Sequence, residues 1–409
     1  MSEAVNIPQL RFPGFSGEWK DKRFDSLYPT VRNGFVGVAT PYYVEEGVPY
    51  LQGKNIKSGA INRNGLVYIN ESFHQKSKKS QLRQNDIVMV QSGHVGECAV
   101  ITEEFEDTNC HALLVSTPTH DIDSKFYINY FYSKFGRKKI YRITTGNTIK
   151  HILSSDLKIQ TVSNPSYQEQ QKIAAFLTAV DTKIEQLSKK QELLGEYKKG
   201  SMQQIFSQAI RFKADDGSEF PEWKERRLGD VCSKAKSGGT PRSTTKEYYD
   251  GDIPFLAISD ITRQGKYLTS ASKKISQLGI DNSASWIVPI DTIIYSMYAS
   301  VGFVSINKIP LATSQAVINL IVKDGYSIEF IYYHLIEVKK TIHKFIETGT
   351  QGNLNAQTVK SLILNIPSLP EQAKIANFLS SIDNKIEQVG KQLDESKQFK
   401  KALLQQMFV

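Results

Sequence analysis

Two stretches of the chain, residues 165–206 and 367–408, carry apolar residues at alternating steps of four and three. Glu, Gln, Ala, Lys and Leu dominate both stretches, and prolines occur only at their starts. A period of 3.5 residues predicts a long helix with one narrow apolar seam, and about 40 residues at 1.5 Å each gives a rod of about 60 Å. The predicted seam positions are Ile173, Leu177, Val180, Ile184 and Leu187 in the first stretch, and Ile375, Leu379, Ile382, Ile386 and Val389 in the second.

The two stretches are copies of one another. Residues 165–186 and 367–388 are identical at 14 of 22 positions, at a constant offset of 202. A single helix of this kind is explained equally well by a coiled coil and by an amphipathic helix that packs on an ordinary core. Two copies with the same seam favour an antiparallel coiled coil formed by the pair.

The duplication extends beyond the helices. Matching anchors occur around Trp19 and Trp223, at Val48–Leu51 and Ile253–Leu256, and at His111–Leu113 and Gln315–Val317. The layout is therefore globular, helix, globular, helix, with a turn near residues 214–217 opening the third part. The predicted boundaries are 1–160, 161–211, 212–366 and 367–409.

Each globular part has the pattern of a mixed α/β domain. Short β-branched and aromatic runs predict strands at 87–90, 99–101, 293–295 and 317–322, and helices at 126–140 and 328–345. Between the anchors the two parts diverge freely. We therefore expect two copies of one scaffold that are related by an internal pseudo-twofold axis and present two different surfaces.

Composition narrows the class of protein. Of 409 residues, 40% are hydrophobic and 23% charged, which is typical of a folded chain, and there is no apolar run long enough to predict a membrane span. Three scattered cysteines indicate no disulfide framework, so we expect a reducing, cytoplasmic location. The net charge of +9 fits a polyanionic partner such as double-stranded DNA.

Catalytic motifs are not supported. Asn164-Pro165-Ser166-Tyr167 is similar to the loop with which amino-methyltransferases hold a flipped base, but its duplicate lacks both Asn and Tyr, so we interpret it as the turn that opens the helix. No glycine-rich nucleotide fingerprint follows a strand, and the histidines and cysteines lack zinc-ligand spacing. We predict no catalytic residue, no metal and no cofactor in this chain.

The loops carry side chains suited to phosphates and base edges. Asn and Gln can pair bidentately with adenine, Arg and Lys with guanine, and Ser and Thr with phosphate. For any single residue an ordinary polar surface explains the pattern better, but the repeated placement in both parts favours recognition. The candidate DNA-binding residues are Gln52, Lys54, Asn55, Ser92, His94, Thr145, Asn147 and Lys150 in the first part, and Lys236, Thr240, Arg242, Ser259, Arg263, Tyr298, Ser300, Thr350, Gln351 and Asn353 in the second.

Together these motifs resemble a type I restriction–modification specificity subunit, over essentially the whole length. The duplicated segments 169–186 and 371–388 carry the resemblance, with the paired Trp-Lys openings and Ser237-Gly238-Gly239-Thr240-Pro241. The first part departs from the family in having Val38-Ala39-Thr40-Pro41 at the last of these motifs.

The resemblance implies a non-catalytic subunit for phage defence with two target recognition domains. Each domain would read one half of a bipartite, asymmetric DNA site. The helices would dock two methyltransferase subunits and, through them, restriction subunits. S-adenosylmethionine, ATP and magnesium would belong to those partners. A coiled-coil protein scaffold without sequence-specific DNA readout is the alternative.

Overall fold

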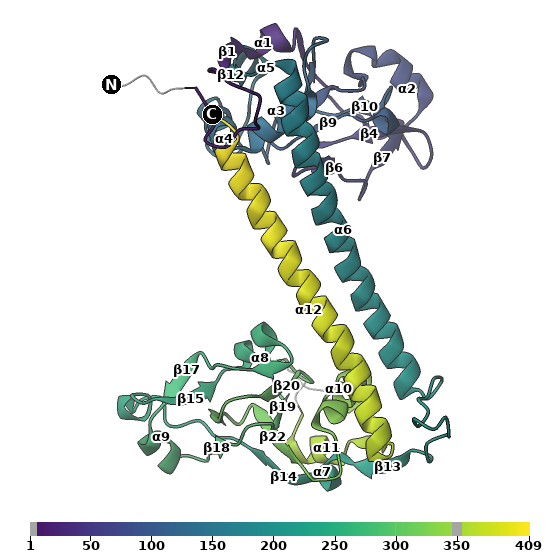
Figure 1. Ribbon diagram of the computed structural model, residues 1–409, viewed down its shortest axis with the longest axis vertical. Coiled ribbons are helices and arrows are strands. Elements are labelled where there is room, and N and C mark those ends of the chain that lie inside the picture. The colour runs from purple at the N-terminus through teal and green to yellow at the C-terminus, as the bar shows by residue number, and fades with distance from the viewer. Residues whose placement is uncertain (1–5, 299, 346–353) are drawn as a thin grey trace. The chain divides into compact units, whose positions relative to one another are not determined.

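The computed structural model describes residues 6–298, 300–345 and 354–409 (Figure 1). The chain forms two compact units, one made of residues 1–189 with 390–409 and the other of residues 190–389. Hereafter they are called unit 1 and unit 2. Each unit therefore contains one mixed α/β part, the beginning of one long helix and the end of the other.

Unit 1 is built on two small sheets. Its principal sheet has the order β2-β11-β8-β9, and its second sheet has the order β10-β4-β7-β3, in which β10 and β4 are parallel. The elements of its α/β part are β1 (Lys20–Arg23), α1 (Phe24–Leu27), β2 (Thr30–Asn33), η1 (Thr40–Tyr42), β3 (Tyr43–Val44), β4 (Val48–Leu51), η2 (Gly53–Asn55), β5 (Ile56–Lys57), β6 (Ala60–Ile61), β7 (Val67–Ile69), α2 (Glu71–Lys76), η3 (Lys78–Ser80), β8 (Ile87–Val90), β9 (Cys98–Val100), η4 (Glu103–Phe105), β10 (Asn109–Cys110), β11 (Leu113–Thr117), α3 (Ser124–Tyr132), α4 (Lys134–Arg142), α5 (Ser154–Lys158) and β12 (Thr161–Asn164).

Unit 2 repeats the centre of this topology, with an additional strand, β16, that pairs parallel to β20 in the principal sheet. Its principal sheet has the order β14-β22-β19-β20-β16, and its second sheet the order β17-β15-β21-β18, again with one parallel pair, β15 and β21. The elements of its α/β part are β13 (Lys224–Arg227), α7 (Leu228–Val231), β14 (Cys232–Ser237), η5 (Lys246–Tyr248), β15 (Ile253–Leu256), α8 (Ile258–Gln264), β16 (Tyr267–Leu268), β17 (Lys273–Ile275), α9 (Gln277–Asp281), β18 (Ile287–Val288), β19 (Ile293–Ser296), β20 (Val304–Asn307), β21 (Leu311–Thr313), β22 (Val317–Val322), α10 (Ile328–Val338), η6 (Lys339–Phe345), α11 (Ala356–Ser361) and β23 (Ile363–Ile366).

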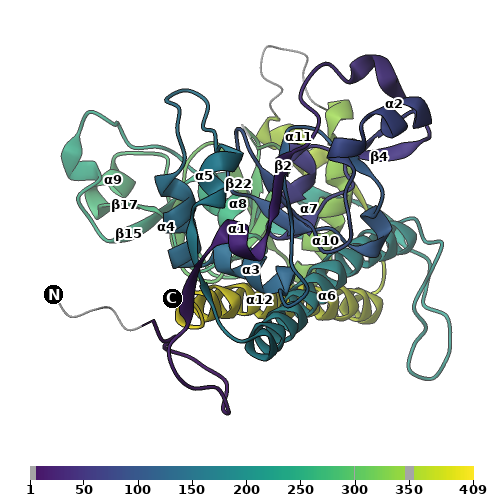
Figure 2. The same cartoon turned by 90° about the horizontal axis from the view of Figure 1, so that it is seen from above.

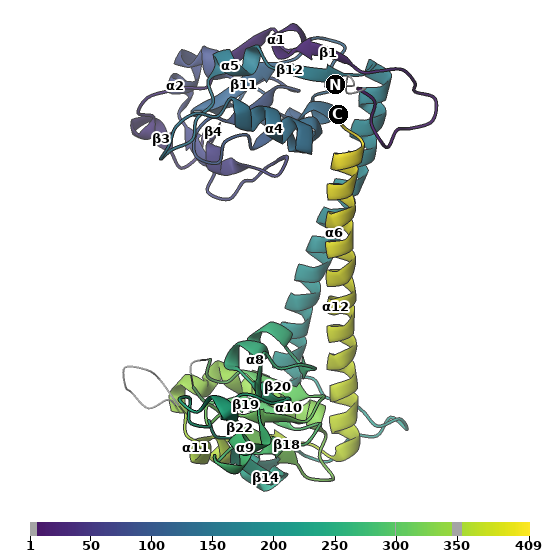
Figure 3. The ribbon, with the colours of Figure 1, turned by 90° about the vertical axis from the view of Figure 1, so that its left-hand side faces the viewer.

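The long helices are α6 (Tyr167–Phe206) and α12 (Leu369–Gln406), and they are in contact (Figures 1 and 3). In unit 1 the start of α6 shares a core with Leu403 from the end of α12 and with Met407 and Phe408, which follow α12 directly. In unit 2 the end of α6 shares a core with the start of α12. The helices are therefore antiparallel in each unit, as the seam predicts.

Seam residues do more than join the two helices. Ile173 and Leu177 are buried in the same cluster as Trp19 and Phe126 of the α/β part. The seam near the start of α6 therefore belongs to the core of unit 1. The buried seam positions are Ile173, Leu177, Leu187, Ile375, Leu379, Ile382 and Val389, and the partly buried ones are Val180, Ile184 and Ile386.

Two ion pairs between the helices repeat at the offset of 202. Lys400 Nζ lies 2.6 Å from Asp181 Oδ1 in unit 1, and Lys198 Nζ lies 2.5 Å from Asp383 Oδ1 in unit 2. The start of each long helix is also fixed by a buried glutamate that binds an arginine, Glu169 with Arg11 and Glu371 with Arg211. These pairs fix the register of the helices on each unit.

The end of the chain is joined to its beginning by hydrogen bonds. Leu10 N–H donates to the Gln406 carbonyl at 2.9 Å, and in unit 2 Ile210 N–H donates to the Gln204 carbonyl at 3.2 Å. Figure 2 shows the purple segment that starts at residue 6 close to the C-terminal end of α12. The segment 6–19 therefore takes the place at α12 that residues 207–223 take at α6.

One predicted helix is divided in two. The pattern over 126–140 predicted a single helix, but α3 ends before Ser133, whose extended backbone starts α4 and whose hydroxyl accepts from Gly136 N–H. A Cβ at Gly136 would meet the Tyr130 carbonyl at 2.0 Å, so only glycine permits this tight turn between the helices. The segment predicted at 328–345 likewise changes from α10 to the tighter η6.

Candidate nucleic-acid interface

A basic cleft of about 1380 Å³ opens in unit 1. It lies between the turn 53–58, the loop 90–97, helix α4 and the loop 144–150. Its wall contains six lysines and arginines and a single carboxylate, Glu97. The charged and polar lining comprises Lys54, Lys57, Ser58, Ser92, His94, Glu97, Arg137, Lys138, Tyr141, Arg142, Thr144 and Lys150. A concave surface with this charge concentrates polyanions.

Four candidate residues from three separate loops meet in this cleft: Lys54, Ser92, His94 and Lys150. The loops are fastened to each other, because Gly93 N–H donates to the Lys150 carbonyl and the Ser92 hydroxyl lies 2.5 Å from His151 Nδ1. Ser92 and His94 follow β8 directly, which places them at the rim of the principal sheet. The sheet thus brings together residues that are far apart in sequence.

Thr145 and Asn147 are exposed in the loop that borders the cleft. Thr145 and His151 exchange two backbone hydrogen bonds of 2.9 Å, which close the loop into a hairpin. Gly146 has a left-handed φ of +93°, and a Cβ there would meet the Ile149 carbonyl at 2.2 Å. Glycine at this position therefore permits the hairpin that the two hydrogen bonds close.

Asn55 shapes the turn and is not available to DNA. Its side chain is fully buried, accepts from Gln52 N–H and donates to the Asn62 carbonyl. Gln52 is partly buried, and its amide donates to the Tyr43 hydroxyl at 2.8 Å. The candidate Asn55 is therefore better explained as a cap of η2, since a base cannot reach its buried amide.

The wall formed by α4 is held by Glu97. This carboxylate accepts from Arg137 at 2.8 Å, from the Tyr132 hydroxyl at 2.9 Å and from Ser58 N–H at 2.6 Å. Burial acts to raise the pKa of Glu97, but these hydrogen bonds and the positive charge of Arg137 together hold it below its ordinary value. Glu97 thus stays charged and fixes one cation of the cleft.

Sequence reasoning missed most of this wall. Lys57, Arg137, Lys138, Tyr141 and Arg142 line the cleft but were not candidates. The signal was the run of residues 134–142, KFGRKKIYR, in which five of nine residues are cationic. Tyr141 is 78% exposed, and such a ring beside cations is suited to stacking on a base or lying along a sugar.

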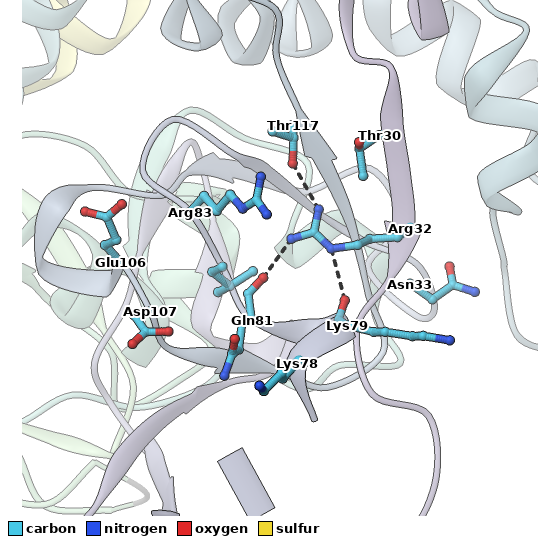
Figure 4. A pocket seen from close by; sticks show the side chains of 11 residues that line it. Thr30, Arg32, Asn33, Lys78, Lys79, Gln81, Arg83, Glu106, Asp107 and Thr117 are labelled. Atoms are coloured by element: carbon cyan, nitrogen blue, oxygen red, sulfur yellow. Dashed lines mark hydrogen bonds between the residues drawn. The ribbon is translucent and has the colours of Figure 1, made fainter. Parts of the chain in front are cut away.

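A second polar hollow of about 590 Å³ lies beside β2 and η3 of unit 1 (Figure 4). At its centre Arg32 donates to the carbonyls of Lys79 and Gln81 and to the Thr117 hydroxyl, and it pairs with buried Asp86 at 3.2 Å. Arg32 is therefore committed to the protein, while Lys78, Lys79 and Arg83 are exposed around it.

In unit 2 the candidates Lys236, Thr240, Arg242, Ser259, Arg263 and Tyr298 are exposed and Ser300 is partly buried. Arg263 pairs with Asp260 at 2.6 Å, and the Thr240 hydroxyl donates to Gln315 Oε1 at 2.7 Å. Gln315 is exposed, and the sequence pattern indicated it as an anchor of the duplication but not as a candidate DNA-binding residue. Thr350, Gln351 and Asn353 lie outside the described residues.

The loops that carry these candidates are anchored in the same way in the two units. Strand register matches Val90 with Ser296, so Ser92 and His94 correspond to Tyr298 and Ser300. Ile152 N–H donates to the Gln91 carbonyl at 3.0 Å, and Leu354 N–H donates to the Met297 carbonyl at 3.0 Å. The buried caps Asn55 and Asp260 also correspond, because each accepts from the backbone three residues earlier.

Residues of the suspected base-flipping loop are used structurally. Asn164 Oδ1 accepts from the Tyr127 hydroxyl at 2.6 Å and from the Gln170 amide, immediately before α6 begins.

In the described part of the chain no cluster of three or more potential metal ligands is present. Within the same residues, no helix is long and apolar enough to cross a membrane.

Duplicated α/β units that place variable polar loops on identical anchors, and a basic cleft on at least one of them, define a class of nucleic-acid recognition protein. Comparison with known families makes the assignment specific. The family described as "Type I restriction modification DNA specificity domain" matches residues 17–194 and 221–396. The chain belongs to this family and is the DNA specificity subunit, a non-catalytic part, of a type I restriction–modification system.

Curated relatives agree with this family. The chain is 32% identical over 193 residues to the type I restriction enzyme MjaIX specificity subunit of Methanocaldococcus jannaschii, covering 46% of this chain and 44% of that protein. It is 24% identical over 401 residues to the putative MjaX specificity subunit of the same organism, covering 95% and 92%. It is 28% identical over 175 residues to the HindI specificity subunit of Haemophilus influenzae, covering 40% and 37%.

Solved structures share the fold. The S subunit of a type I restriction–modification system from M. genitalium superposes with a TM-score of 0.62 at 19% identity, over 98% of this chain and 99% of that one. A chain from a study of complex assembly and conformational transition of a type I system gives 0.55 at 16% identity, over 97% of both chains.

Proposed function

We propose that this subunit binds an asymmetric, bipartite DNA site, and that each unit reads one half. The observation that carries the proposal is the substitution of loop residues on shared anchors: Ser92 and His94 in unit 1 stand where Tyr298 and Ser300 stand in unit 2. Equal anchors with unequal side chains would give two half-sites of different sequence.

The basic cleft of unit 1 supports a DNA path along that unit. Lys54, Lys57, Lys150 and Arg142 are exposed and suited to phosphate contacts, while Ser92 and His94 at the sheet rim are suited to base edges. In unit 2, Lys236, Thr240, Arg242, Ser259, Arg263, Tyr298 and Ser300 remain the candidate DNA-binding residues, with Thr350, Gln351 and Asn353 proposed from the sequence alone.

We further propose that the paired helices dock two methyltransferase subunits, and through them restriction subunits, in the cytoplasm. The duplicated ion pairs and helix seam support this, because a pseudo-twofold repeat gives two nearly equivalent surfaces. S-adenosylmethionine, ATP and magnesium would be bound by these partners.

The test is to map methylated adenines in cells that express this chain with its methyltransferase subunit. We expect a split, asymmetric motif with a fixed gap. Arg242→Ala should relax or weaken only one half of the motif, by about 1–3 kcal/mol if a bidentate base contact is lost. Methylation without sequence preference would instead favour the scaffold that lacks DNA readout.

A further inference from the structure

Each unit has one further polar side chain at the edge from which its candidate loops extend. His111 in unit 1 and Gln315 in unit 2 occupy equivalent positions, two residues before β11 and β22. Strand register places the start of β11 beside the end of β8, and the start of β22 beside the end of β19. In unit 2, Met297 N–H also donates to the Ala316 carbonyl at 2.9 Å. Both residues therefore lie next to the loops that follow β8 and β19.

In unit 2 a hydroxyl holds one end of the Gln315 amide. The Thr240 hydroxyl donates to Gln315 Oε1 at 2.7 Å, and both side chains are exposed. Two glycines bring Thr240 to this place. A Cβ at Gly238 would overlap the Thr313 carbonyl, and Gly239 N–H donates to the same carbonyl at 2.9 Å. The Gly-Gly-Thr segment therefore sets a hydroxyl against the glutamine.

Unit 1 has the same arrangement, built from different residues. The Tyr50 hydroxyl lies 3.2 Å from His111 Nδ1, and His111 is partly buried. Burial lowers the pKa of His111, so the imidazole is neutral near pH 7. Tyr50 belongs to β4, and its counterpart in β15 is Phe255, which is equally buried and has no hydroxyl. The strand thus packs with either ring, and each unit supplies the hydroxyl from a different segment.

The two pairings leave one polar atom of each side chain without a hydrogen bond to any described residue, namely Nε2 of His111 and Nε2 of Gln315. A hydrogen bond between exposed side chains such as Thr240 and Gln315 adds little stability, because both groups bond well to water. Its effect is on orientation. A side chain that is already held in one orientation loses less conformational entropy when it binds a partner.

We infer that His111 and Gln315 are base-reading residues, and that Tyr50 and Thr240 are positioning residues that orient them. The inference rests on the proposed function and adds one specificity-determining contact to each half-site. Because Thr240 donates to Gln315 Oε1, Gln315 presents N–H donors to the DNA. Such donors suit an acceptor on a base edge, such as guanine O6 or thymine O4.

The test maps methylated adenines in cells that express the full chain with its methyltransferase subunit. Gln315→Ala should lower discrimination at one base pair of one half-site about tenfold, because one hydrogen bond is lost, and the other half-site should not change. His111→Ala should do the same in the other half-site. Gln315→Glu replaces the donor by an acceptor and should shift the preference toward a base with an amino group, cytosine or adenine.

The positioning residues are tested by removing only their hydroxyls. Thr240→Val and Tyr50→Phe should weaken discrimination at the same base pair as the alanine variant of the residue that each holds, while Thr240→Ser should keep the natural motif. Gln277→Ala is the matched control. Gln277 is exposed and donates to Asp281 at 2.8 Å, but it follows β17 at the opposite edge of the second sheet. This control should keep the natural motif.

The outcomes separate this inference from the proposed function. An unchanged motif in both alanine variants would overturn the inference and leave the proposed function intact. An equal loss of methylation at every sequence would also overturn it, because phosphate contacts do not depend on the bases. A natural chain without a split motif would overturn both. Circular dichroism melting checks that each variant is folded, and an unchanged motif in Thr240→Val and Tyr50→Phe would overturn the positioning role.

Discussion

Replacing three lysines of the unit 1 cleft should change how DNA binding depends on salt. Lys54, Lys57 and Lys150 are exposed in the cleft wall, and changing all three to Gln lowers the formal net charge from +9 to +6. Each lost phosphate contact should lower the slope of log K against log salt by about 0.9, so the triple variant should lose about 2.7 of slope. Between about 50 and about 200 mM salt, its affinity should then fall about 40-fold less than that of the natural chain.

The measurement is fluorescence anisotropy with a duplex of random sequence, titrated with the protein at several salt concentrations. The matched control is a triple variant of Lys76, Lys78 and Lys79 to Gln. These lysines are also exposed in unit 1, and the variant has the same net charge, but they lie outside the cleft. We expect the control to keep the natural slope.

Two results would refute the reasoning. An equal loss of slope in both triple variants would show that net charge matters and the position of the charge does not. An unchanged slope in the cleft variant would show that DNA follows another surface, and the lysines around the hollow of Figure 4 would then be the next candidates.

Three further predictions concern the cores and the helices. Leu177→Asp places a charge at a fully buried position and should cost several kcal/mol of unfolding free energy in urea titration; a loss below about 1 kcal/mol would contradict the packing. Burial lowers the pKa of His334 to about 4, so the unfolded chain takes up a proton that the folded chain refuses. Stability should therefore fall by about 3 kcal/mol as pH drops from about 6.5 to about 4, and His334→Phe should remove that part of the pH dependence. Seven residues inserted after Gln186 preserve the seam and lengthen α6 by about 10 Å, so the gap between half-sites should widen by up to about three base pairs; a modified site with an unchanged gap would show that the helices do not set the spacing.

The parts of the fold that were predictable are those specified by local periodicity or by repetition. The strands at 87–90 and 317–322 have the predicted bounds, because buried β-branched runs between turns leave little ambiguity. The break at Ser133 was not predicted. A serine cap and a close glycine contact are single-residue effects that a hydrophobic pattern spanning the turn conceals.

The cleft was less predictable than the helices. Its lysines come from a turn, a helix and a loop between residues 54 and 150, and only the folded chain brings them together. Polarity alone also does not identify the role of Asn55. An asparagine that caps a turn and an asparagine that binds adenine are indistinguishable in the sequence. Burial separates the two cases, and it depends on tertiary structure.

The duplication also indicates how specificity can be exchanged. Unit 2 is fixed to its helices by Lys266, which donates to the Tyr333 hydroxyl and the Ser380 hydroxyl, while Tyr333 donates to Asp383 at 2.6 Å. Unit 1 has Asn129 at the position of Tyr333, and its amide donates within its own helix. The two units therefore differ at this contact with the helix. The loops that follow β8 and β19 share their backbone anchors, so an exchange of loops is the smaller perturbation and should carry the half-site with it.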